Sequence, residues 1–139
     1  MSTAVVEPYN SVLNMHSAMD FTDMAIIMDN EAIYDMCNKY LNVSSPTYNV
    51  INRLCAQVFS SLTVSLRYES CLNADLAAMS TNLIPYPRIH FPIVNYAPIL
   101  TLEKAMHQQL SICEITREVF EPCFQMVKCD PTLCKYMSC

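Results

Sequence analysis

The sequence contains no glycine among its 139 residues, although ordinary chains carry about 7%. Glycine adopts positive φ at little cost, so every turn that needs this conformation must use asparagine, aspartate or a strained residue. A glycine-rich phosphate loop of any type is also excluded from this sequence. We therefore expect that the chain by itself does not hold a triphosphate in that way.

Charge and hydropathy exclude further classes of protein. The 8 basic residues are scattered among 13 acidic ones, for a net charge of −5, so nucleic-acid binding is not expected. The longest strongly apolar run, residues 24–28, is far shorter than the roughly 20 residues of a membrane helix. Residues 1–8 do not resemble a signal peptide, so we expect a soluble intracellular protein without a membrane partner, whose 8 cysteines are reduced.

A long apolar helix is predicted over residues 46–68. Pro46 and a neighbouring serine or threonine are typical of a capped helix start, and Arg67 suits the negative end of the helix dipole. Apolar residues also occur on its other sides, which indicates a helix enclosed by the rest of the fold. The residues that recur at helical spacing and predict a buried face are Ile51, Leu54, Cys55, Val58, Leu62 and Leu66.

The chain before this helix predicts an open α/β sheet. Glu7 and Pro8 are typical of a helix start, and the apolar run at residues 24–28 predicts a strand buried on both faces. Asn30 follows this strand and is a candidate cap for a helix over residues 31–40. In such sheets ligands bind beyond the carboxyl ends of the strands, where Asn30 lies.

After Pro85 the composition changes from helix-rich to proline-punctuated, which predicts two partial domains, residues 1–84 and 85–139. The other expected elements are a helix over residues 76–83, a strand over 91–96, a polar loop over 99–109, a helix that begins at the capping box of Ser111 and Glu114 and buries Ile112, Ile115, Val119 and Phe120, and the start of a strand over 135–139.

Few patterns in the sequence point to chemistry. The three histidines have no cysteine or acid at zinc-ligand spacing, and the loose spacing of Cys129, Cys134 and Cys139 favours buried free thiols over a metal site. Asn73 and Asp75 are either loop-forming and capping groups or groups that act on a ligand. Asn30, Tyr48 and Asn52 together are able to stack on a purine and hydrogen-bond to it, a hypothesis that the pattern alone leaves open.

The chain closely resembles the α-tubulin family along essentially its whole length. The α form is indicated by TNLIPYPRIHF, HQQLSICEIT and VKCDP. The resemblance covers the middle portion of the family's chain, so it implies the carboxyl half of a Rossmann-like nucleotide domain with a long core helix, followed by the start of a two-layer α/β sandwich. The segments that carry it are STAVVEPYNSVL, DNEAIYDMC, SSLTVSLRY, CLNADL, STNLIPYPRIHFPI, EITREVFEP, QMVKCDP and KYMSC.

The resemblance also implies a ligand, GTP. Asn30 and Asn52 resemble the asparagines that read guanine, and Tyr48 resembles the residue stacked on the base. Thr3 and Glu7 fall in the loop near the ribose. The family's phosphate loop, and with it the binding of Mg²⁺, belongs to an earlier part of the family's chain than the portion resembled here.

The resemblance implies a structural constituent of cytoplasmic microtubules. Its implied partners are β-tubulin and neighbouring tubulin subunits. Residues 99–109 resemble the lateral-contact loop, with His107 as its inserting residue. The LNADL segment, with Leu72, Asn73 and Asp75, resembles the longitudinal loop that reaches the nucleotide of the next β-subunit.

The sequence departs from the family pattern at positions that matter for GTP hydrolysis. Ala78 stands where the family has its catalytic glutamate, so we expect no stimulation of a partner's hydrolysis. Family glycines are replaced at Ala56, Ser70 and Cys134. Two alternatives to the structural subunit therefore stay open: a truncated copy that does not assemble, and a module that binds tubulin without nucleotide.

Overall fold

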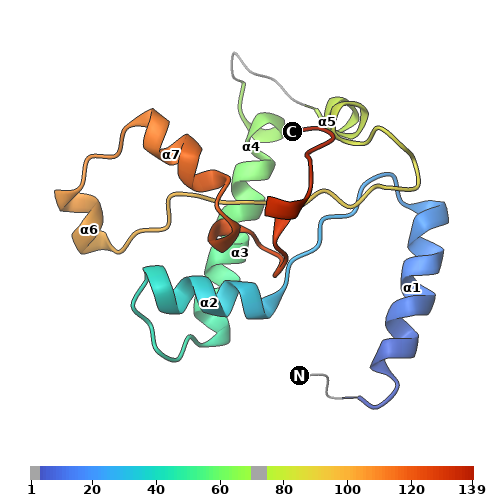
Figure 1. The fold of residues 1–139 in the computed structure, drawn as a ribbon, viewed down its shortest axis with the longest axis horizontal. Helices are drawn as coiled ribbons and strands as arrows, with labels where there is room; N and C mark the ends of the chain where they lie inside the picture. Colours follow the sequence, from blue (N-terminus) through green and yellow to red (C-terminus); the bar gives the residue numbers. More distant parts are fainter. Residues whose placement is uncertain (1–3, 70–74) are drawn as a thin grey trace.

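The computed structural model describes residues 4–69 and 75–139, and its regular elements are helices (Figure 1). In a core made of helices, each helix buries one face against its neighbours. The elements in chain order are α1 (Glu7–Phe21), α2 (Asn30–Tyr40), α3 (Tyr48–Leu62), α4 (Val64–Arg67), α5 (Leu76–Leu83), α6 (Leu102–His107), α7 (Ile112–Val119) and the 3₁₀ turns η1 (Pro122–Phe124) and η2 (Pro131–Leu133).

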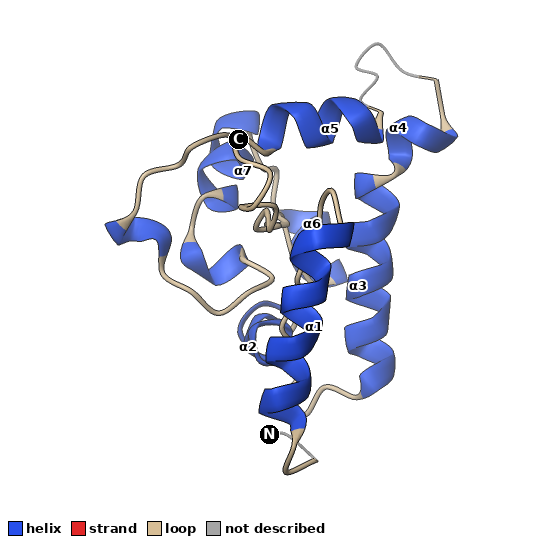
Figure 2. Cartoon of the chain, turned by 90° about the vertical axis from the view of Figure 1, so that its right-hand side faces the viewer, coloured by secondary structure: helices blue, strands red, loops and turns tan. Residues whose placement is uncertain are grey.

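The hydrophobic core lies where α2 packs against α3, with residues from two extended segments added to it (Figures 1 and 2). Ile33 on α2 and Val58 on α3 are almost completely buried. The extended segments contribute Val94, Phe124 and Met126. The full set of buried apolar residues is Ala32, Ile33, Met36, Cys37, Ile51, Leu54, Val58, Val94, Ile99, Phe124 and Met126.

The predicted long helix is present, but it is neither continuous nor enclosed. Ile51, Leu54 and Val58 are buried as predicted, whereas Phe59 and Leu66 are 50% and 49% exposed. The helix is interrupted at Thr63, whose hydroxyl donates to the Phe59 carbonyl at 2.8 Å. Thr63 has φ −99° and ψ 6°, outside the helical region, so α3 ends at Leu62 and α4 begins at Val64.

Two predicted helix starts are wrong in detail. Asp29, not Asn30, is the N-cap of α2, because its Oδ1 accepts the Glu31 N–H at 3.0 Å. Thr47 precedes α3 without a capping bond from its side chain. The Ser111–Glu114 capping box of α7 is confirmed, since Ser111 Oγ accepts the Glu114 N–H while the Glu114 carboxylate accepts the Ser111 N–H.

The expected α/β architecture is wrong: the described residues contain no sheet and only one isolated antiparallel bridge, Asn95 with Gln125. Residues 24–28 run extended between α1 and α2. Within the run the Ala25 N–H donates to the His90 carbonyl, and directly after it the Asp29 N–H donates to the Met126 carbonyl. A strand needs consecutive ladder bonds, and these contacts are single ones. The carboxyl half of a Rossmann-like domain and the start of a sandwich are therefore absent from the part of the chain described.

The other two predicted strands are corrected in the same way. Residues 91–96 are extended and meet residues 124–126 through the two bonds of the Asn95–Gln125 bridge, Met126 N–H to the Val94 carbonyl and Tyr96 N–H to the Phe124 carbonyl. Pro92 has no N–H to give to a ladder, which limits how far this pairing extends. Residues 135–139 form no strand.

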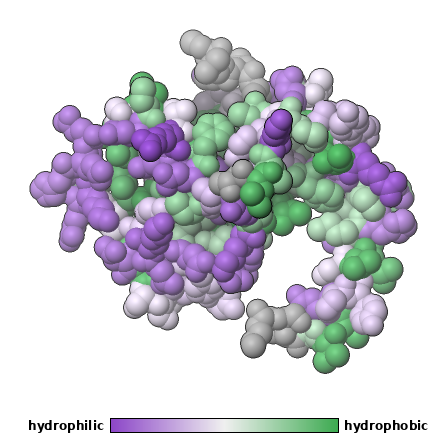
Figure 3. All heavy atoms as spheres, viewed as in Figure 1, coloured by the Kyte–Doolittle hydropathy of each residue, from purple (hydrophilic) through white to green (hydrophobic). Residues whose placement is uncertain are grey.

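The helices outside the core expose much of their surface. Figure 1 shows α1 at one side of the molecule, and none of its residues is buried. Figure 3 shows hydrophilic side chains gathered over α6 and α7, opposite exposed apolar side chains along α1. The predicted inward face of α7 is wrong for Ile112 and Phe120, which are 83% and 46% exposed, because its capping box defines the helix start without requiring packing.

The absence of glycine has the predicted consequence at one turn. Asn42, which follows α2, has a φ of 55°. Asparagine tolerates the left-handed region better than most residues because its short amide can bond locally. This position confirms that asparagine replaces glycine in a turn of this chain.

Candidate functional site

The residues expected to read a guanine base lie exposed on the two packed helices of the core. Asn30 is the first residue of α2, Tyr48 is the first residue of α3, and Asn52 lies one turn further along α3. The Tyr48 side chain is 72% exposed, and both asparagines are exposed. Their polar groups and the phenol ring are thus accessible to a ligand and are not buried in the core.

The two residues expected near the ribose are not joined to this group. Glu7 is the first residue of α1 and is exposed, and residues 22–29 separate α1 from α2. Within the part of the chain that the structure describes, no hydrogen bond links Glu7 to Asn30, Tyr48 or Asn52. Thr3 lies outside the described residues.

The expected longitudinal contact is described only at its end. Asp75 is the N-cap of α5, and its Oδ1 accepts the backbone N–H of Ala78 at 2.7 Å. The capping interpretation of Asp75 is therefore confirmed, and one of its carboxylate oxygens is engaged within the chain. Leu72 and Asn73, together with Ser70, lie outside the described residues.

The expected lateral-contact loop contains a short helix. His107 is the last residue of α6 and is exposed. Thr101 caps this helix by accepting the Lys104 N–H on its hydroxyl. Figure 1 shows α6 and α7 together at the edge of the molecule away from α1, so this segment is open to a neighbour.

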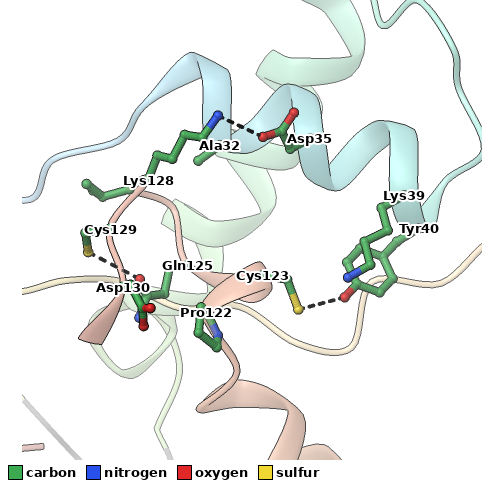
Figure 4. A pocket seen from close by; sticks show the side chains of 11 residues that line it. Ala32, Asp35, Lys39, Tyr40, Pro122, Cys123, Gln125, Lys128, Cys129 and Asp130 are labelled. Atoms are coloured by element: carbon green, nitrogen blue, oxygen red, sulfur yellow. Dashed lines mark hydrogen bonds and ion pairs between the residues drawn. The ribbon is translucent and has the colours of Figure 1, made fainter. Parts of the chain in front are cut away.

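A groove of about 460 Å³ lies between α2 and residues 122–130, and the sequence patterns did not indicate it (Figure 4). The Tyr40 ring stacks on Phe124 with 4.6 Å between ring centroids, and its hydroxyl donates to Cys123 Sγ at 2.8 Å. The Lys39 ammonium lies 5.3 Å from the centre of the Tyr40 ring. Residues that line the groove are Ala32, Asp35, Lys39, Tyr40, Pro122, Cys123, Gln125, Val127, Lys128, Cys129 and Asp130.

Charged groups stabilise the wall of this groove. Lys128 forms salt bridges with Glu31 and with Asp35, the latter at 3.4 Å. These salt bridges connect residues 122–130 to α2. Its bond to Glu31 raises the pKa of Lys128. Burial and the bond to Cys123 raise the pKa of Tyr40, so the phenol stays protonated as a hydrogen-bond donor at neutral pH.

The cysteines are more exposed than the sequence predicts. Cys37 is buried, and its burial, with Cys55 nearby, raises the pKa of its thiol. Cys129, Cys134 and Cys139 are exposed free thiols rather than buried ones. Across residues 4–69 and 75–139, no group of three histidine, cysteine or acidic side chains is placed to hold a metal ion.

One buried histidine was also missed by the sequence patterns. His90 is completely buried, stacks on Phe91 and lies 3.2 Å through Nδ1 from the Pro87 carbonyl. Its Nε2 atom is the buried side-chain atom without a partner among the described residues. With the proton assigned to Nδ1, Nε2 is an acceptor in an apolar setting, which is unfavourable for folding.

Comparison with known families gives a match in the carboxyl-terminal part of the chain. Residues 87–139 match the family model described as the tubulin C-terminal domain. The matched part contains α6 with His107, α7, and the wall of the groove from Pro122 to Asp130. The match supports membership of the tubulin family, and the division into residues 1–84 and 85–139 stays a prediction. No helix in the described part of the chain is long and apolar enough to cross a membrane.

Proposed function

We propose that the chain is an α-tubulin-like structural subunit that pairs with β-tubulin and neighbouring tubulin subunits in cytoplasmic microtubules. The observation that carries this proposal is the match of residues 87–139 to the tubulin C-terminal domain. The segments TNLIPYPRIHF, HQQLSICEIT and VKCDP support the α form. A cytoskeletal role follows from the family.

In this proposal the chain contacts the guanine base of GTP through Asn30, Tyr48 and Asn52. An exposed phenol ring offers a stacking surface, and two exposed amides offer both donors and acceptors for the edge of the base. Because the sequence has no glycine, its own backbone offers no glycine-rich phosphate loop. The base, rather than the triphosphate, is therefore the part of the nucleotide that this chain recognises.

The pairing surfaces are α6 with His107 on one side and the start of α5 on the other. His107 and Asp75 are both exposed, which leaves them accessible to another subunit. Ala78 presents a methyl group where the family has an acid, so the subunit contributes contact but no base for hydrolysis. This assigns the chain a structural and not an enzymatic role at the interface.

Competition between nucleotides tests the guanine contact. We expect GTP to displace a fluorescent guanine nucleotide from the purified chain at least about tenfold better than ATP, because unpaired polar groups penalise the wrong base. Asn52→Ala should abolish this preference, while Asn49→Ala, on the same exposed stretch of α3, should preserve it. Equal displacement by both nucleotides would contradict the guanine contact.

A second function, a tubulin-binding module that uses no nucleotide, is favoured by the absence of glycine. The two functions differ in co-sedimentation with microtubules. The structural subunit should pellet with microtubules more strongly in GTP than in ATP. The nucleotide-free module should pellet equally in both.

A further inference from the structure

We propose that the groove between α2 and residues 122–130 is a covalent modification site, in which the Cys123 thiol adds to a small α,β-unsaturated carbonyl compound. The proposal rests on the groove alone and is independent of pairing with tubulin. Cys123 lines the groove from the wall formed by residues 122–130, and Figure 4 shows its sulfur directed at the Tyr40 hydroxyl.

The Cys123 thiol lies between a hydrogen-bond donor and a proton acceptor. The Tyr40 hydroxyl donates to Sγ at 2.8 Å, and the thiol donates to Glu121 Oε2 at 3.5 Å. A donor aimed at sulfur stabilises the negative charge that develops there during attack, and a carboxylate within reach can accept the thiol proton. In this proposal Tyr40 is the hydrogen-bond donor to the attacking sulfur, and Glu121 is the base that accepts the thiol proton.

The groove also has the size and walls for a small organic molecule. Its volume of about 460 Å³ falls within the roughly 300–1,000 Å³ of typical ligand pockets. Pro122, Val127 and the Tyr40 ring provide apolar surface for an alkyl chain. Lys39, held 5.3 Å from the centre of the Tyr40 ring, provides an ammonium group for the carbonyl oxygen. Lys128 is already engaged by Glu31 and Asp35.

The reaction is an addition. It releases no leaving group and needs no oxidant or reductant. Glu121 takes the thiol proton while Sγ forms a bond to the β-carbon of the unsaturated carbonyl compound. The electron pair of the carbon–carbon double bond moves to the α-carbon, and the resulting enolate is stabilised by the Lys39 ammonium. The α-carbon then takes a proton from water, and Glu121 releases its proton to solvent, which completes a thioether.

Three other thiols among the described residues lack this combination and serve as internal controls. Cys129 lines the same groove but donates to the amide oxygen of Gln125 at 3.3 Å. Cys37 is buried in the core and is closed to a reagent. Cys113 is exposed on α7, outside the residues that line the groove. Selective modification of Cys123 would thus report on the groove and not on exposure.

The test is site-resolved labelling of the full chain with trans-2-hexenal, followed by borohydride reduction and peptide mass mapping. The variants are Tyr40→Phe, Cys123→Ser and, as a matched control, Tyr136→Phe, which makes the same change at an exposed ring. Tyr40→Phe keeps the ring that stacks on Phe124, and circular dichroism of each variant checks that the fold is retained.

We expect Cys123 to react about tenfold faster than Cys113 in the unmodified chain. In Tyr40→Phe the rate at Cys123 should fall about tenfold while the rate at Cys113 stays the same, whereas Tyr136→Phe should change neither rate. The proposal is overturned if Cys123 reacts no faster than Cys113, or if the folded Tyr40→Phe variant reacts at the original rate.

Discussion

Individual polar side chains determine where several helices of this chain begin. Asp29, Asp75 and Ser111 each accept a backbone N–H that the first turn would otherwise leave without a partner. Asn42 supplies the positive φ after α2. Because a cap and its partner lie within three residues of each other, the sequence patterns indicated the caps Asp75 and Ser111, although they placed the cap of α2 at Asn30 instead of Asp29.

The capping box of α7 predicts a dependence of stability on pH. The Glu114 carboxylate accepts hydrogen bonds from the Ser111 backbone N–H and from the Ser111 hydroxyl. These bonds, the backbone one above all, lower the pKa of Glu114 from its ordinary 4.5. Because the folded-state pKa is the lower one, this contribution is complete above the unfolded value and is lost as pH falls through the folded value. Urea unfolding across acidic pH should show this loss in the unmodified chain and not in Glu114→Gln. The exposed control Glu103→Gln should keep it.

Asp75 predicts a loss of stability on truncation. Asp75→Ala removes the acceptor of the Ala78 N–H and should reduce the free energy of unfolding by about 1 kcal/mol. Asp20→Ala is the matched control, because Asp20 lies at the carboxyl end of α1, where a negative charge opposes the helix dipole. Denaturant titrations that show equal losses for both variants would contradict the capping role.

Ala78 predicts a gain of function at a tubulin interface. Ala78→Glu restores an acid where the family has one and should raise GTP turnover in a mixture with β-tubulin by about 10²–10⁴-fold. The measurement is release of inorganic phosphate at fixed β-tubulin concentration. Ala77→Glu, at the exposed residue that precedes Ala78 on α5, is the control and should leave turnover unchanged. Unchanged turnover in both variants would contradict the assignment of position 78.

Among the elements, α2 joins the two halves of the chain. Its inner face packs on α3, while Tyr40 stacks on Phe124 and Lys128 pairs with Glu31. The periodicity of α3 indicated a buried face correctly at Ile51, Leu54 and Val58. It did not indicate that the opposite face stays exposed, because apolar residues on a helix do not reveal whether a neighbour covers them.

This packing predicts a large effect of truncating the Phe124 ring. Phe124 is 3% exposed, so Phe124→Ala should reduce the free energy of unfolding by about 3–5 kcal/mol. Phe21→Ala makes the same change at a ring that is 89% exposed and should alter stability by less than about 0.5 kcal/mol. Similar effects of the two changes in denaturant titrations would contradict the position of the core.

At the scale of the whole molecule, the sequence predicted helices better than their assembly. The starts of α1 and α7 and the extent of α5 follow from local residues such as Pro8 and the capping box. The expected sheet did not form, because an apolar run such as residues 24–28 packs equally well as an isolated extended segment. The Tyr40–Cys123 contact joins residues 83 positions apart, which no local pattern reports.

The distribution of apolar side chains suits a chain that works within an assembly. Large apolar residues such as Tyr9, Leu13 and Phe21 on α1, and Leu102 and Met106 on α6, are exposed. Exposed apolar surface of this extent is typical of surfaces that other chains cover. This agrees with the proposed role as a subunit beside other tubulin chains.

Sedimentation velocity of the fluorescently labelled chain, titrated with purified αβ-tubulin, tests that role most directly. We predict that the labelled chain moves into a faster-sedimenting species at micromolar tubulin, that the transition saturates, and that excess unlabelled chain reverses it. A labelled chain that sediments at the same rate with and without tubulin, while its circular dichroism shows a folded helical protein, would contradict the proposal that it pairs with tubulin.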